Sequence, residues 1–206
     1  GRWSDALCAL AGIPPAALPR IGRPTDLAGV ITARAAADTG LRAGTPVILG
    51  ASDSAVEDYA AGAVAPGQCV LKLATAGNVN VMTAKARPHR ETLTYSHVVP
   101  GLWYTVTATN SAAVCQRWYR DTFCAPGTSY DAIDGEAAKA PPGSNGVFFH
   151  PYLQGERSPY WDANLRGSFT GLSMASTRGD MSRALLEGVA YSLRDCYRTI
   201  EKMKLK

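Results

Sequence analysis

One carboxylate stands at a corner of the chain where chemistry is feasible. In "GTPVILGASDSAVEDYAAGAV", residues 44–64, Asp53 follows an apolar run and precedes an amphipathic one. The small residues 50–52 leave room for a ligand, so Asp53 is a candidate general base that accepts a proton from a hydroxyl. The simpler interpretation is a helix N-cap, whose side-chain oxygen accepts an exposed backbone N–H. Local chemistry favours the cap and leaves both interpretations open.

Two further stretches carry groups that bind ligands. "LATAGN", residues 73–78, has a glycine turn whose backbone N–H groups, with the Thr75 hydroxyl, could hold a phosphate. Most turns of this kind only join two strands. "YLQGERSPYWD", residues 152–162, combines Glu, Arg, Asp and aromatic residues in one loop. That loop either binds a ligand or forms a buried ionic staple, and the staple is favoured.

No histidine or cysteine has the spacing of a metal site. His89, His97 and His150 are isolated, and the five cysteines include no C-x-x-C pair. We therefore expect no metal ligands among these residues. The cysteines are expected to be reduced thiols, as in a cytoplasmic protein.

The composition is that of a folded globular protein. Hydrophobic residues make up 46% of the 206 residues and charged residues 18%, which fits one large domain or parts of two. The net charge of +4 is spread along the chain, so no basic arm for nucleic acid is indicated. No apolar run approaches the roughly 18 residues that span a bilayer, and no signal peptide is recognisable. Nucleic-acid binding and membrane insertion are therefore not expected.

The hydrophobic pattern predicts helices and strands in alternation. Residues 4–11 should form a short helix capped by Ser4, and residues 47–49 a buried strand. Helical spacing follows Asp53, and "APGQ" at 65–68 ends it, which makes that stretch the best domain boundary. Beyond it, antiparallel strands should flank a tight turn at 75–77 and continue through 83–109.

The remainder of the chain is expected to end in a long helix. Residues 110–123 should form a moderate helix and 147–172 a mostly irregular segment. Apolar residues then recur at helical spacing as far as Met203, with Asp180 as the expected cap. Strands mixed with helices predict an α/β protein, in which ligands gather beyond the carboxyl ends of strands. Asp53 occupies such a position.

Three stretches together resemble the FGGY family of carbohydrate kinases along essentially the whole chain. They are "LAGVITARAAADTGLRAGTPVILGASDS", "LKLATAGNV" and "YLQGERSPYWDANLRGSFTGLSMASTRGDMSRALLEGVAYSLRD". The resemblance implies an RNase H-like α/β fold of the actin, Hsp70 and sugar-kinase type, with two domains around a cleft. It implies that 1–66 is the C-terminal part of the first, sugar-binding domain. Residues 67–206 would be most of the second, nucleotide-binding domain.

The same resemblance assigns roles to residues. Asp53 matches the family's catalytic base, and Ser54 occupies the adjoining position, which contacts the sugar in relatives. Thr75 and Gly77 fall in the family's second phosphate-binding turn, as cofactor-binding residues. That turn is L-G-T-S-G in the family, so alanines 74 and 76 replace a glycine and a serine. If the glycine needs positive φ, an alanine there would weaken phosphate binding.

The function implied by the resemblance is ATP-dependent phosphorylation of a terminal hydroxyl of a sugar, with Mg²⁺ as cofactor. A ketopentose such as D-xylulose is the expected substrate, and glycerol kinase or a non-catalytic sugar-binding relative are the alternatives. The family's first phosphate loop and its adenosine-binding glycine cluster should lie outside residues 1–206. The chain is therefore expected to be an internal fragment that is inactive alone. A homodimer in the cytoplasm is one expected assembly.

Overall fold

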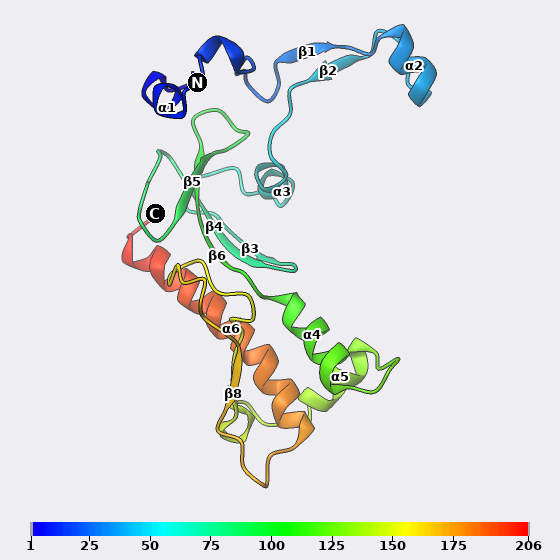
Figure 1. Ribbon diagram of the computed structural model, residues 1–206, viewed down its shortest axis with the longest axis vertical. Helices are drawn as coiled ribbons and strands as arrows, with labels where there is room; N and C mark the ends of the chain where they lie inside the picture. The colour runs from blue at the N-terminus through cyan, green and yellow to red at the C-terminus, as the bar shows by residue number, and fades with distance from the viewer. Residues whose placement is uncertain (1, 206) are drawn as a thin grey trace. The chain divides into compact units, whose positions relative to one another are not determined.

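The computed structural model describes residues 2–205 and divides into two compact units. Unit 1 is Gly1–Glu57 and unit 2 is Asp58–Lys206. In Figure 1 the blue and cyan segments belong to unit 1 and the start of unit 2, and the green to red segments belong to unit 2.

Unit 1 is built from short elements. Two helices, a 3-10 helix and a two-stranded antiparallel ribbon follow one another as α1 (Asp5–Ala11), η1 (Pro15–Ala17), β1 (Leu27–Val30), α2 (Ala33–Thr39) and β2 (Pro46–Ile48). Ser4 caps α1, because its hydroxyl oxygen accepts the backbone N–H of Leu7 at 3.4 Å, and α1 ends at Gly12 with φ of 67°. The predicted N-terminal helix and its cap are confirmed.

The prediction of a buried strand at 47–49 is wrong in one respect. The strand is present as β2, but Val47, Ile48 and Leu49 are 38%, 57% and 40% exposed. A ribbon of two strands has no second layer within unit 1 to cover either of its faces. The β-branched run therefore predicted the strand correctly, but the predicted burial of its side chains is wrong.

Unit 2 contains a four-stranded antiparallel sheet of order β3-β4-β6-β5. Its strands are β3 (Cys69–Leu73), β4 (Gly77–Thr83), β5 (Leu93–Ser96) and β6 (Trp103–Thr109). Residues 74–76 join β3 to β4, which pair from Leu73 opposite Gly77 to Cys69 opposite Val81. The predicted hairpin at this turn is confirmed.

Helices and a second, two-stranded sheet follow the four-stranded sheet. They are α4 (Ala113–Phe123), α5 (Tyr130–Ala137), the 3-10 helix η2 (Ser144–Gly146) and α6 (Arg178–Lys202), with β7 (Phe148–His150) paired to β8 (Ser168–Thr170). The segment expected to be mostly irregular therefore contains a two-stranded sheet. The predicted cap of the long helix is wrong by three positions. Thr177 is the N-cap, and Asp180 completes a capping box by accepting the Thr177 backbone N–H at 2.7 Å.

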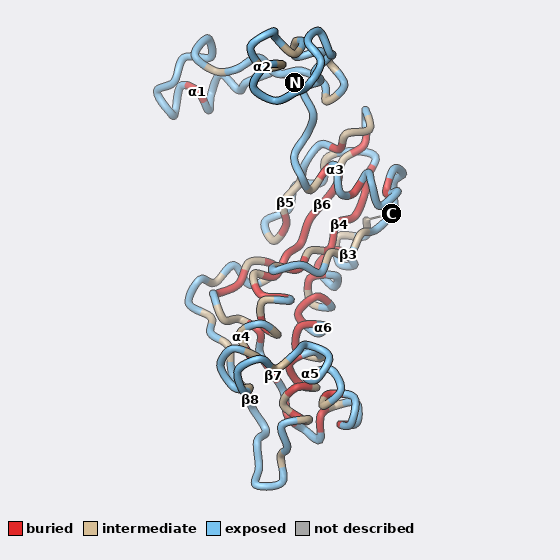
Figure 2. The backbone as a smooth tube through the Cα atoms, turned by 90° about the vertical axis from the view of Figure 1, so that its right-hand side faces the viewer, coloured by how far each residue is buried: buried red, intermediate tan, exposed pale blue. Residues whose placement is uncertain are grey.

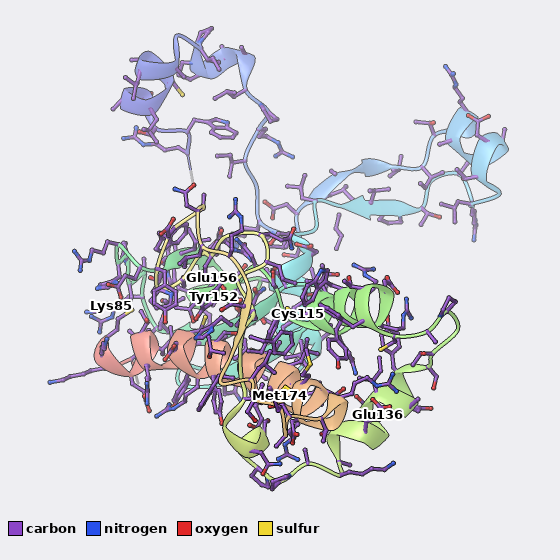
Figure 3. All side chains as sticks on the ribbon, turned by 60° about the horizontal axis from the view of Figure 1, so that its bottom comes forward. Lys85, Cys115, Glu136, Tyr152, Glu156 and Met174 are labelled. Atoms are coloured by element: carbon purple, nitrogen blue, oxygen red, sulfur yellow. The ribbon has the colours of Figure 1, made fainter. Side chains whose placement is uncertain are left out.

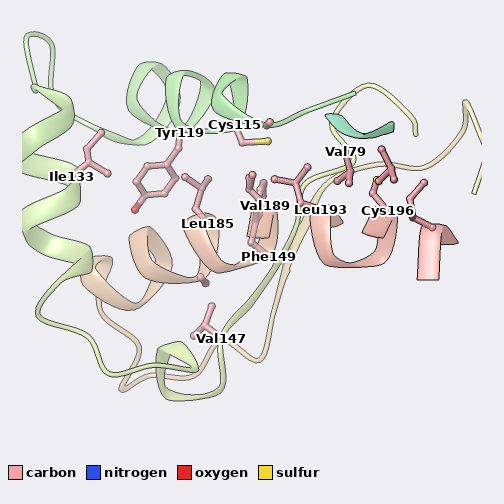
Figure 4. Packing of buried hydrophobic residues seen from close by; sticks show 14 residues of the cluster. Val79, Cys115, Tyr119, Ile133, Val147, Phe149, Leu185, Val189, Leu193 and Cys196 are labelled. Atoms are coloured by element: carbon pink, nitrogen blue, oxygen red, sulfur yellow. The ribbon is translucent and has the colours of Figure 1, made fainter. Parts of the chain in front are cut away.

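The core of unit 2 lies between α6, α4 and the sheet. Buried residues concentrate along β4, β6 and α6 (Figure 2). Tyr119 and Cys115 of α4 face Leu185 and Val189 of α6 in the close-up of Figure 4. Helix α6 packs against both β4 and β6, the two central strands of the sheet.

Within residues 2–205, no helix combines the length and apolar character needed to cross a membrane. The five cysteines are free thiols, of which Cys8, Cys115 and Cys196 are buried.

Candidate functional site

Asp53 lies where the sequence placed it, between a strand and a helix. β2 ends at Ile48, and α3 (Asp53–Ala60) begins four residues after Leu49, beyond a glycine with φ of 72° at position 50. The backbone N–H of Val56 donates to the Ser52 carbonyl at 3.1 Å, so Ser52 occupies the cap position. Asp53 is the first residue inside the helix, and the N-cap interpretation of its carboxylate is wrong by one position.

The Asp53 carboxylate is exposed to solvent. Its Oδ1 accepts the backbone N–H of Ser54 at 2.7 Å. The half-buried Ser54 follows on the same helix turn. The local structure therefore presents an anionic, accessible acceptor beside a hydroxyl.

The second candidate element is the turn at 74–76, between β3 and β4. Its carbonyl oxygens accept the first backbone N–H groups of the α4 N-terminus. The Thr75 oxygen accepts from Ala112 at 2.9 Å, and the Ala74 oxygen accepts from Ala113 at 2.9 Å. These bonds satisfy donors that a helix leaves unpaired at its start, and they hold the turn against α4.

Gly77 closes this turn for a steric reason. A Cβ at this position would lie 2.8 Å from Leu193 Cδ2, 3.0 Å from Thr109 Cγ2 and 3.2 Å from Ala112 Cβ. Gly77 is not among the residues with positive φ, and neither are the two alanines of the turn. The backbone of the turn therefore has no conformation that alanine strains, and weaker phosphate binding by a turn with Ala74 in place of glycine stays a prediction.

The exposed side of the turn carries unused donors. Thr75 is exposed, and among residues 2–205 its backbone N–H and that of Ala76 find no acceptor. The Thr75 hydroxyl adds a third donor with no partner in the same part of the chain. A hairpin turn with free N–H groups and a hydroxyl has the chemistry that holds an anion such as phosphate.

The structure brings the predicted site residues together as two pairs. Asp53 and Ser54 are adjacent in unit 1, and Thr75 and Gly77 share one turn in unit 2. Helix α3 begins in unit 1 and ends in unit 2.

A buried hydrogen-bond network around Glu156 was not predicted from the sequence. Glu156 is only 4% exposed, and its carboxylate accepts the Thr109 hydroxyl at 2.6 Å and the Asn110 backbone N–H at 2.8 Å. Figure 3 labels it on the loop between β7 and β8, together with Tyr152. The buried ionic staple favoured from the sequence is not seen for Glu156, which has no ion pair within the described residues. Its partners are hydrogen-bond donors, which the letters "GER" alone could not reveal.

The buried thiols near this network are chemically quiet. Burial, reinforced by the negative charge of Glu156, raises the pKa of Cys115 to about 12. Burial and then the charges of Glu156 and Asp195 raise the pKa of Cys196 to about 12. Thiols with such values remain protonated near neutral pH and are poor nucleophiles. In the part of the chain that the structure describes, no group of three or more His, Cys, Asp or Glu could hold a metal ion.

Models of two protein domains match the chain. Residues 70–206 match the C-terminal domain of the FGGY family of carbohydrate kinases, and residues 1–58 match its N-terminal domain. The first of these matches alone covers more than half of the chain.

Individual relatives agree with the domain matches. The chain is 32% identical over 206 residues to a xylulose kinase of Lactococcus lactis subsp. lactis, covering 100% of this chain and 41% of that protein. It is 30% identical over 201 residues to a gluconokinase of Bacillus subtilis, covering 93% of this chain and 39% of the relative. The chain thus spans about two fifths of the length of the curated relatives it matches.

A solved structure gives the same result for the fold. The crystal structure of xylulose kinase from Rhodospirillum rubrum superposes with a TM-score of 0.84 at 36% identity, over 97% of this chain and 41% of that one. The mixed helix and sheet architecture is therefore the actin-like fold of sugar kinases, as expected from the sequence. From the domain matches, the relatives and the fold together, we conclude that the chain belongs to the FGGY family of carbohydrate kinases.

Proposed function

We propose that this protein transfers the γ-phosphoryl group of ATP to a terminal hydroxyl of a sugar. The observation that carries the proposal is the exposed carboxylate of Asp53 at the first turn of α3, at the position of the family's catalytic base. As the sugar oxygen attacks the γ-phosphorus, Asp53 accepts the hydroxyl proton. ADP leaves with the β–γ bridging oxygen. Ser54 is the neighbouring contact for the sugar.

The turn at 74–77 is our candidate for the phosphate side of the reaction. Phosphoryl transfer depends mainly on positioning and on neutralising charge around the transferred group. The free N–H groups of Thr75 and Ala76 and the Thr75 hydroxyl suit that task, and Gly77 lets the turn lie close to α6 and β6. Mg²⁺ bound with ATP would neutralise phosphate charge, and it normally needs only one or two protein carboxylates besides the phosphates.

The two parts of the chain would divide this work. We assign residues 1–66 to the sugar-binding domain and residues 67–206 to the nucleotide-binding domain, with Asp53 and Ser54 in the first and Thr75 and Gly77 in the second. A cytoplasmic location and a homodimer belong to the same proposal.

The substrate we propose is a ketopentose such as D-xylulose. The similarity to xylulose kinases over 100% of the chain supports it. A sugar acid is the second candidate, because a gluconokinase matches over 93% of the chain at nearly the same identity. Glycerol is a third, weaker candidate. A pocket built for several sugar hydroxyls would leave polar groups unpaired around glycerol, at a cost of about 1 to 3 kcal/mol for each group.

A competition assay tests the substrate and the reaction together. The protein at its full family length is incubated with ATP and equal concentrations of D-xylulose, D-ribulose, D-gluconate and glycerol, and the phosphorylated products are quantified. We expect xylulose phosphate to dominate. If gluconate phosphate or glycerol phosphate dominates, the substrate assignment is wrong and the kinase activity stands. ATP hydrolysis without any sugar phosphate would contradict the proposed function.

A further inference from the structure

We infer that Glu156 is a positioning residue for the phosphate-binding turn at 74–77. The inference rests on the proposed function, because a positioning role for Glu156 requires that the turn at 74–77 binds phosphate. Glu156 lies 79 residues beyond Gly77 in the sequence, and the hydrogen bonds of its carboxylate run to Thr109, Asn110 and Arg157. It acts through the end of β6 and the start of α4.

The first step runs from the Glu156 loop to the end of β6. Glu156 Oε2 accepts the Thr109 hydroxyl at 2.6 Å, and Oε1 accepts the Asn110 backbone N–H at 2.8 Å. The Arg157 backbone N–H also donates to Oε1, at 2.7 Å. A buried carboxylate is stable only when its oxygens are bonded in this way, and bonds to a charged acceptor are stronger than neutral ones. The carboxylate therefore fixes the backbone where β6 ends.

Two backbone contacts bring the same loop to the same strand end. The Ser158 N–H donates to the Ala108 carbonyl at 3.1 Å, and the Asn110 side-chain amide donates to the Gly155 carbonyl at 3.2 Å. Gly155 has φ of 71°, and a Cβ there would lie 2.6 Å from the Ala163 carbonyl oxygen. The loop thus closes only with glycine at this position, and it delivers the next residue, Glu156, into the interior.

The second step runs from the end of β6 to the turn. Thr109 pairs with Gly77 across β4 and β6, and the methyl of Thr109 bounds the space that Gly77 leaves empty. Three residues further on, the α4 N-terminus donates to the turn from Ala112 and Ala113. Because Asn110 lies between these two contacts, holding its backbone sets the position of both.

The start of α4 has no side-chain cap of its own, which explains why support from Glu156 matters there. The N-cap position of α4 is Ala112, which has no side-chain acceptor and an unusual backbone with φ of −115° and ψ of −101°. Ser, Thr, Asp and Asn are strongly preferred at this position, because their side-chain oxygens accept a backbone N–H of the first turn. Here the buried Glu156 carboxylate holds Asn110, which precedes α4 in the chain. The carbonyls of the turn then take the place of a cap.

Steady-state kinetics on the protein at full family length test the inference. Glu156→Ala should lower kcat/KM for ATP by about ten- to a hundredfold, the scale of loss when groups around a reacting centre are slightly misplaced. KM for the sugar should stay within about twofold, because the hydrogen bonds of the Glu156 carboxylate to Thr109 and Asn110 hold the end of β6 and the approach to α4. Glu156→Gln keeps the shape and acceptor oxygen of the side chain and should recover part of the loss.

A matched control separates positioning from ordinary stability. Glu187 also accepts a loop N–H, that of Gly143 at 3.1 Å, and the Ser144 hydroxyl at 3.3 Å, and it pairs with Arg183. Glu187→Ala should lower stability and leave KM for ATP unchanged. If Glu156→Ala does not fold, Thr109→Val keeps the side-chain shape and removes the hydroxyl that donates to Glu156 and accepts the Ser111 N–H at 3.4 Å, with Thr109→Ser as the variant that restores the hydroxyl.

Amide hydrogen exchange provides a readout that does not depend on activity. In Glu156→Ala, peptides covering 74–77 and 110–118 should exchange faster than in the wild type, and in Glu187→Ala they should not. Unchanged exchange together with an unchanged kcat/KM for ATP would overturn the inference. So would equal losses in both variants, which indicate only a structural role. A wild type that phosphorylates no sugar instead removes the proposed function, and the exchange measurement still decides whether Glu156 controls the turn.

Discussion

The two units differ in how their apolar residues are used. In residues 2–57 only Cys8 and Ala55 are buried, and Leu7, Leu10 and Ile48 are 66%, 86% and 57% exposed. In unit 2 a single cluster of fourteen buried residues joins the sheet to α4, α5 and α6. Both units have helices that begin at a Ser or Thr cap, such as Ser4 for α1 and Thr177 for α6, and both have paired strands. Local signals therefore suffice to form elements, whereas burial requires a second layer.

The difference bears on the site as well. Asp53 stands in the unit with little core, on an exposed helix start, whereas the turn at 74–77 is braced by β6, α4 and α6. Substitutions at Asp53 should therefore change chemistry with little change in stability. Substitutions at the turn should change both.

The largest expected effect is chemical and lies in unit 1. Asp53→Asn should lower kcat by about two to four orders of magnitude, because it removes the proton acceptor. ATP affinity and the melting temperature should stay close to the wild-type values. The control is Asp38→Asn, which removes an exposed carboxylate 3.9 Å from Arg34 in the same unit. Wild-type turnover by Asp53→Asn would show that this carboxylate only stabilises the first turn of α3.

The next effect contrasts the cores. Leu185→Ala in α6, where the side chain is 0% exposed, should lower the free energy of unfolding by about 2 to 5 kcal/mol. Leu10→Ala in α1, where the side chain is 86% exposed, should change it by less than about 0.5 kcal/mol. Urea unfolding followed by circular dichroism measures both. Equal losses would mean that unit 1 depends on packing that its exposed side chains do not reveal.

Substitution of one glycine in each unit should show the same difference between the units, with a smaller change in stability. Gly77→Ala introduces a Cβ into a space bounded by Leu193 and Thr109, and this overpacking should cost about 1 to 3 kcal/mol. Phosphate binding should weaken at the same time. Gly29→Ala in β1 meets nothing within 4 Å and should be close to neutral. Thermal denaturation and ATP titration distinguish the two, and a stable Gly77→Ala with normal ATP affinity would remove the close-packing argument.

The smallest effect is a pH dependence confined to unit 2. The folded-state pKa of Cys115 is raised to about 12, so its stabilising contribution is present below the unfolded thiol pKa and is lost as pH rises toward the folded value. Above the unfolded value of about 8.5, the thiol should contribute a decline of at most about 1.4 kcal/mol per pH unit. Cys115→Ala should flatten the decline between pH 8 and pH 10 in urea titrations. Parallel slopes for the two proteins would contradict it.

Elements with strong local signals were predictable from the sequence. The Ser4 cap, the hairpin at 74–76, the helix after Asp53 and the long C-terminal helix follow from periodicity, turn residues and capping side chains. The cap of the long helix was misplaced because Thr177 and Asp180 both carry capping oxygens three residues apart. Only the geometry shows that Thr177 is the cap and Asp180 its reciprocal partner.

Features that depend on distant residues were not predictable. The motif resemblance marked Asp53 and the turn, but the bonds from Glu156 to Thr109 and Asn110 cross 46 or 47 positions of sequence. The exposure of β2 depends on whether a second layer covers it, and a run of three apolar residues carries no information on that. The small helix α5 and the strands β7 and β8 were also not predicted from the local sequence pattern.

Helix α6 ties the parts of unit 2 into one thermodynamic block. Its 25 residues extend over about 37 Å at 1.5 Å per residue, and it packs on β4, β6, β7, α4, α5 and η2. No layer of unit 2 can open far without exposing part of α6. Loss of the helix would uncover the sheet and the smaller helices together. Unit 2 should therefore melt in one cooperative transition that all spectroscopic probes report at the same midpoint.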